Sequence, residues 1–112
     1  MLKFENLAPG EYLLSPNQKY KLSMDYDGHL ILRCNHGNQL QWSTGVYGFN
    51  PGDGLIFQDD GNLVIYELGG GVKFDAGMGG TAADHLRVQD DGNLVLYGPD
   101  GHAFWSQSGS GC

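Results

Sequence analysis

Two nine-residue stretches of the chain carry the same five side chains, placed at every second position. They are Gln58, Asp60, Asn62, Val64 and Tyr66 in one stretch, and Gln89, Asp91, Asn93, Val95 and Tyr97 in the other. The aspartate is a charged acceptor, each amide supplies a donor and an acceptor, and the tyrosine hydroxyl serves in either sense. The valine adds a small apolar patch. Such a set suits a ligand that presents several neighbouring hydroxyls and one face of C–H groups.

The spacing of these residues predicts a β-hairpin in each stretch. The run Asp59-Asp60-Gly61 fits a three-residue loop of type I geometry that closes on a glycine in the left-handed region. With this loop, Gln58 lies opposite Asn62. Because side chains alternate along a strand, the Gln, Asn, Val and Tyr of each stretch point away from the core, and the Asp lies close by in the loop. We call these five shared residues the outward quintet. The other face is wholly apolar, with Leu55, Phe57, Leu63 and Ile65 in one stretch and Leu86, Val88, Leu94 and Leu96 in the other.

The identity of the two quintets favours ligand binding over simple solvent exposure. A face that only contacts water accepts almost any polar residue, so two copies of it would be expected to differ. A scaffold or interaction protein with vestigial sites is the alternative. It would need only the inward residues to be kept, and the recurrence of the outward residues argues against it.

A third, related stretch shows that the chain contains an internal repeat. The turn glycines are Gly28, Gly61 and Gly92, in steps of 33 and 31 residues. Large aromatic residues follow them at similar distances, namely Trp42, Phe74 and Trp105. A period of this length indicates supersecondary units that are each too small to bury their own apolar face. We expect one domain, 1–112, with repeats at about 12–45, 46–79 and 80–112, and three rings that meet near a pseudo-threefold axis.

Composition narrows the fold class and the partners. The 112 residues include 19 glycines among short apolar runs, and no stretch shows sustained helical spacing, so the fold is expected to be all-β. A net charge of −7 argues against nucleic acid and anionic membrane as partners. No apolar run has the length needed for membrane insertion.

With these residues in view, the chain resembles the bulb-type mannose-binding lectins, the family of the snowdrop and garlic agglutinins. Their signature, QxDxNxVxY, is present in full in both quintets. The resemblance covers the whole chain. It implies a β-prism II fold, in which three four-stranded antiparallel sheets surround a pseudo-threefold axis and each sheet carries one shallow site.

The resemblance also implies roles for the quintet. Asp and Asn would hold the axial 2-hydroxyl of mannose, Gln the 2- or 3-hydroxyl and Tyr the 4-hydroxyl, while Val would pack on the ring. Neither a metal nor another cofactor takes part. Members commonly dimerise by exchanging the C-terminal strand, and residues 103–107 are the candidate segment for such a homodimer.

The first repeat departs from the signature. Its outward positions are Asp25, Asp27, His29, Ile31 and Arg33. Only the aspartate of the signature is kept in its place, and isoleucine preserves an apolar contact. Arginine replaces the tyrosine hydroxyl, and histidine changes the donor geometry of asparagine. We therefore expect this degenerate third site to be silent, which leaves two sites per chain for high-mannose glycans to engage by multivalent avidity.

The sequence leaves open the bonding state of the two cysteines and the cellular location of the protein. Cys34 continues the inward parity of its strand, which favours a buried thiol, and Cys112 is expected to be exposed. A bridge between them, or between two copies of Cys112, requires geometry that the sequence does not supply. The first six residues lack the apolar segment of a signal peptide. This predicts a cytoplasmic or unconventionally secreted protein, unless the sequence begins at a mature N-terminus.

Catalytic and metal sites find little support. The pairs Asp59-Asp60 and Asp90-Asp91 invite a glycosidase interpretation, but adjacent turn residues are poorly placed to straddle a glycosidic bond. Counted from Asp25, an EF-hand loop would need glycine and glutamate where the chain has Leu30 and His36. The four histidines show no zinc spacing. We expect no enzymatic activity and no bound metal.

Overall fold

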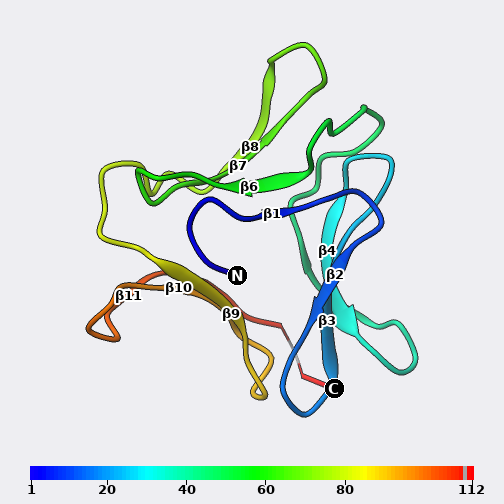
Figure 1. Ribbon diagram of the computed structural model, residues 1–112. Coiled ribbons are helices and arrows are strands. Elements are labelled where there is room, and N and C mark those ends of the chain that lie inside the picture. Colours follow the sequence, from blue (N-terminus) through cyan, green and yellow to red (C-terminus); the bar gives the residue numbers. More distant parts are fainter. Residues whose placement is uncertain (110) are drawn as a thin grey trace.

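In the computed structural model, which describes residues 1–109 and 111–112, the chain forms eleven strands in three antiparallel sheets (Figure 1). The first sheet has the order β2 (Tyr12–Leu14), β3 (Tyr20–Met24), β4 (Leu30–Cys34), β5 (Leu40–Ser43). The second has the order β1 (Asn6–Leu7), β6 (Leu55–Phe57), β7 (Leu63–Tyr66), β8 (Val72–Asp75). The third has the order β11 (Ala103–Gln107), β10 (Leu94–Tyr97), β9 (His85–Val88). The three sheets form the sides of a prism, which confirms the predicted fold class.

The third sheet differs from the expected four strands. It has three, and the free edge of β9 meets the start of the chain instead of a full strand. An isolated bridge joins Leu2 to His85, and the backbone of Met1 exchanges hydrogen bonds with Leu86. Residues 6–7 and 12–14 pair with the other two sheets and add no strand to this edge. Within the described part of the chain, no helix is long and apolar enough to cross a membrane.

The central hairpin of each sheet has the predicted three-residue loop. The Gln58 amide donates to the Asn62 carbonyl at 2.8 Å, and the Gln89 amide donates to the Asn93 carbonyl at 2.9 Å. The turn glycines Gly61 and Gly92 have φ values of 92° and 88°, in the region that glycine adopts without strain. The strand register follows from the loop, with Phe57 opposite Leu63.

The inward faces of the three sheets form one apolar core. Leu22, Leu32, Leu55, Phe57, Ile65 and Leu96 are completely buried. Near the axis the rings of Trp42, Phe74 and Trp105 meet edge to face, with centroids 5.7 to 6.4 Å apart. Such edge-to-face pairs add to the stabilisation from burial alone. The predicted meeting of one ring from each repeat is confirmed.

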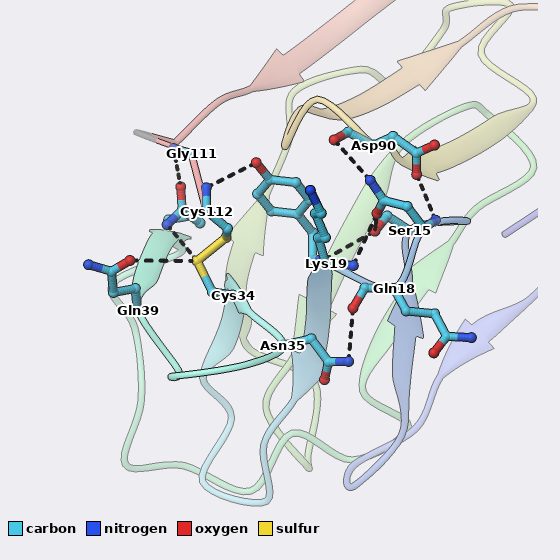
Figure 2. Close-up of a disulfide and its surroundings, with 12 residues drawn as sticks. Ser15, Gln18, Lys19, Cys34, Asn35, Gln39, Asp90, Gly111 and Cys112 are labelled. Atoms are coloured by element: carbon cyan, nitrogen blue, oxygen red, sulfur yellow. Dashed lines mark hydrogen bonds between the residues drawn. A yellow bond between two sulfur atoms is a disulfide. The ribbon is translucent and has the colours of Figure 1, made fainter.

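The end of the chain is tied to the first sheet by a disulfide. Cys112 bonds to Cys34 on β4, 78 residues away in sequence, and the Gln41 side chain and the Tyr20 hydroxyl accept backbone hydrogen bonds from Gly111 and Cys112 (Figure 2). The favoured interpretation of Cys34 as a buried free thiol is therefore wrong, although the residue is buried. The sequence could not decide this, because strand parity gives the direction of a side chain but not what lies beside it.

Candidate functional site

The two outward quintets lie on the outer faces of the second and third sheets, around equivalent turns. In the second repeat, Gln58 and Asn62 flank the turn, Asp60 lies within it, and Val64 and Tyr66 follow on β7. The third repeat repeats this arrangement on β10. Because the hairpin geometry is the same, the Gln, Asn, Val and Tyr of each quintet lie on one side of their sheet, with the aspartate beside them in the turn.

A hydrogen bond joins the first and last residues of each quintet. Gln58 Nε2 donates to the Tyr66 hydroxyl at 2.7 Å, and Gln89 Nε2 makes the same contact with Tyr97. The valines on the same faces are buried, with Val64 exposed by 2% and Val95 by 4%. The small apolar patch predicted at these two positions therefore has little accessible surface. The glutamine–tyrosine pair leaves the face polar and preorganised.

The quintet aspartates also stabilise their own turns. In all three repeats the turn aspartate accepts, through Oδ1, the backbone amide two residues later. Asn62 donates to Asp60 at 3.0 Å, Asn93 to Asp91 at 3.0 Å and His29 to Asp27 at 3.2 Å. Aspartate is favoured in turns for this bond. Its presence in the degenerate first repeat is explained by the turn, so aspartate alone does not mark a binding site.

The two quintet asparagines differ in their surroundings. Asn62 is only 7% exposed; its Nδ2 donates to Asp75 at 2.8 Å, and its Oδ1 accepts the backbone amides of Leu63 and Met78, each at 3.0 Å. Asn93 is half-buried, and its Nδ2 donates to Asp91 over a long 3.4 Å. The two asparagines, which the sequence predicts to be equivalent, therefore differ in burial and in hydrogen-bond partners.

Asp75 is a neighbour of the second quintet that the signature does not include. It lies opposite Val64 in the β7–β8 register, and its Oδ1 also accepts the Gly77 amide. The hydrogen bond from Asn62, and then that from Gly77, lowers the pKa of Asp75 below its ordinary value. A signal was present in the sequence, because Asp75 follows Phe74 where serine follows the tryptophan of each other repeat.

The outward positions of the first repeat hold a different set of contacts. An ion pair of 3.4 Å joins Arg33 to Asp25, at the places where the other repeats pair tyrosine with glutamine. The His29 ring lies 5.2 Å from that of Tyr47. Ile31 on β4 is half-buried. Among the described residues, His29 Nε2 and Arg33 Nε are buried without a hydrogen-bond partner.

The quintet of the third repeat borders a cavity. A hollow of about 630 Å³ lies between β2 and β9, and Gln89 and Asp91 are among its lining residues. On the other side of the quintet, the His85 ring stacks on Tyr97 with centroids 5.4 Å apart. The stacking limits the freedom of the tyrosine, so its hydroxyl is held in place.

Several solved structures are similar to this chain. A monomeric mannose-binding lectin from Gastrodia elata matches with a TM-score of 0.82 and 28% identity, over 100% of this chain and 97% of that one. The mannose-specific agglutinin from snowdrop (Galanthus nivalis), solved with methyl α-D-mannoside, matches with a TM-score of 0.75 and 28% identity over 93% of each chain. A domain-swapped lectin dimer from Mycobacterium smegmatis is 34% identical over 95% of each chain, with a TM-score of 0.53. No family model and no curated protein sequence match the chain.

Proposed function

This chain is a divergent member of the bulb-type mannose-binding lectin family, and we propose that it binds α-D-mannose and high-mannose glycans through the outward quintets of its second and third repeats. Its structural neighbours are lectins, which bind carbohydrate without transforming it, and it is a binding protein rather than an enzyme. The proposed sites are shallow and use no metal.

The observation that carries this proposal is the equivalent arrangement of the two quintets. Both place an amide donor and a phenol in contact through one hydrogen bond, beside a turn whose aspartate accepts the backbone amide of the quintet asparagine. The first repeat keeps the turn and the core but replaces the glutamine–tyrosine pair by an aspartate–arginine ion pair. Packing alone requires the inward residues, so the repeated outward residues are best explained by a shared ligand.

The proposed sites should be individually weak. Each hydrogen bond to a sugar hydroxyl replaces one to water, and its net contribution is about 1 kcal/mol. A Kd on the order of 1 mM for a single mannose, about −4 kcal/mol, follows from a few such bonds. Several linked sites can raise the avidity for clustered glycans by about 10² to 10⁴ when their spacing allows simultaneous contact.

Titration with methyl α-D-mannoside, followed by the backbone amide shifts of the chain, tests the proposal. We expect saturable shifts around Tyr66 and Tyr97 and none around Arg33. Methyl α-D-glucoside, which differs only in the orientation of the 2-hydroxyl, should shift the same amides far less. Equal shifts with both sugars, or shifts confined to the first repeat, would contradict the assignment.

A matched pair of variants locates the ligand within the third repeat. Asn93→Asp removes an amide donor at the turn and should weaken mannoside binding at that site by at least about tenfold, because a lost donor leaves a sugar hydroxyl unpaired. His29→Asp places the same side chain at the equivalent turn position of the first repeat and should leave both mannoside affinities unchanged. If the two variants bind mannoside alike, the site is misplaced.

Dimerisation by exchange of the C-terminal strand stays a prediction. Neighbours of both kinds exist, a monomeric lectin from Gastrodia elata and a domain-swapped dimer from Mycobacterium smegmatis. In this chain β11 pairs with β10, and the segment that follows is bonded to Cys34. Exchange should therefore be favoured by reduction, and light scattering of the oxidised and reduced protein would detect a change in mass.

A further inference from the structure

The quintets of the second and third repeats have the same residues, but the hydrogen bonds of their asparagine side chains differ. We propose that Asp75 sets the affinity of the second site by holding the Asn62 side chain, so that the third site binds mannose more tightly than the second. This inference rests on the proposed function. It makes Asp75 an affinity-determining residue that lies outside the signature.

The hydrogen bonds of Asn62 leave little for a ligand. Its oxygen already accepts two backbone amides, from Leu63 and Met78, and one of its two N–H groups is donated to Asp75 at 2.8 Å. A carbonyl oxygen has two lone pairs and an amide nitrogen has two hydrogens, so a single N–H remains. With the residue only 7% exposed, a sugar hydroxyl would have to displace an existing partner.

The segment after β8 fixes this arrangement. The Gly77 amide donates to Asp75 Oδ1, the Met78 amide to Asn62 Oδ1, and the Gly80 amide to the Asp60 carbonyl. Residues 77–80 therefore fold back over the turn of the second quintet. Moving Asn62 toward a ligand would break contacts with this segment as well as the bond to Asp75.

The other two repeats show which residue is responsible. Asp75 lies opposite Val64, Ser106 lies opposite Val95, and Ser43 lies opposite Ile31, so the three positions are equivalent. Asp75 Oδ1 accepts both the Asn62 Nδ2 and the Gly77 amide, and a serine side chain has no carboxylate oxygen to take its place. In the third repeat the side-chain amide of Asn93 has only the long 3.4 Å contact to Asp91 among the hydrogen bonds of the described residues, and a ligand can replace that contact at little cost.

The experiment is a site-resolved titration of the full chain with methyl α-D-mannoside, with the amide of Tyr66 reporting on the second site and that of Tyr97 on the third. In the natural sequence we expect the second site to bind about three- to tenfold more weakly, the range that one hydrogen bond sets. Asp75→Ser should tighten the second site by that factor and leave the third unchanged. Asp75→Asn keeps an acceptor oxygen and should tighten it less.

The third site serves as an internal control in each variant, because unchanged mannoside binding there shows that the protein is folded. A second site as tight as the third in the natural sequence, or one that Asp75→Ser does not tighten, would overturn the role of Asp75 while leaving the proposed function intact. Absence of mannoside shifts at both sites in all three proteins would instead overturn the proposed function, and this inference with it.

Discussion

Gly92 lies against the ring of Tyr20, and a Cβ atom on this glycine would come within 2.8 Å of the ring. The contact joins the turn of the third repeat to β3 of the first sheet. The same relationship recurs around the axis, because a Cβ on Gly28 would meet Phe49 at 2.5 Å and one on Gly61 would meet Thr81 at 2.8 Å. Each turn thus packs on the repeat that follows it cyclically, which explains why all three repeats keep the glycine.

Replacing Gly61 or Gly92 by alanine should lower the free energy of unfolding by about 1–3 kcal/mol, because the new Cβ meets both backbone strain and a neighbouring repeat. Gly69→Ala is the matched control. Its φ is also positive, at 104°, but no atom lies within 4 Å of the added Cβ. Urea denaturation would measure the difference, and equal losses at all three positions would show that the contact between repeats contributes nothing.

Aspartate in place of the two asparagines should have unequal effects on stability. Asn62→Asp puts a second carboxylate against Asp75 where an amide now donates, and the loss should be about 1–3 kcal/mol, or roughly 5 °C in Tm. Asn93→Asp changes a more exposed side chain and should leave Tm within about 1 °C. Thermal unfolding followed by circular dichroism would compare the two, and equal melting temperatures would contradict the buried role of Asn62.

Removing the disulfide should destabilise the chain strongly. The bond closes a loop with a sequence separation of 78 residues, and the entropy lost by the unfolded chain then corresponds to about 4 kcal/mol. The double variant Cys34→Ser with Cys112→Ser should show this loss in denaturant unfolding. Dithiothreitol should destabilise the natural protein by a similar amount and leave the double variant unaffected, and any other pattern would mean that the bond does not form.

The carboxyl of Asp75 predicts a pH dependence of stability. Its pKa is lowered in the folded chain by the Asn62 amide and the Gly77 N–H, from an ordinary value of 3.8. The stabilisation of the fold by the Asp75 carboxylate is therefore complete above that value and is lost as the pH falls through the lowered pKa. Compared with Asp75→Asn, the natural protein should lose its advantage as the pH falls below 3.8. Parallel stability curves for the two proteins would refute the linkage.

The sequence was sufficient to predict the turn, the strand parity and the three-part core. A three-residue loop fixes which residue faces which, so one glycine in each repeat determines the side of the sheet for every following residue. The inward positions, such as Leu55, Phe57 and Ile65, are fully buried as this parity requires. The third sheet was mispredicted as four-stranded, because an edge strand depends on which distant segment reaches it.

The remaining misses involve contacts between segments far apart in the chain. Burial of Asn62 depends on Met78, and the bond of Cys34 depends on Cys112, and neither partner is marked by local periodicity. Asp75 was within reach, since aligning the three aromatics shows one aspartate beside two serines. Strand parity predicts which face of its own strand a side chain occupies. The contacts of Asn62 and Cys34 are instead made by segments that lie outside the hairpins.

The disulfide also decides what a protease can release from this molecule. Residues 35–111 all lie between the two bonded cysteines, and this span includes the exposed hairpin end at Gly69–Gly71. A nick at that hairpin would produce two peptides that stay covalently joined and packed on a shared core. The cut would be visible only on a reducing gel. Until the disulfide is reduced, the nicked protein should have the mass of the intact protein plus one water.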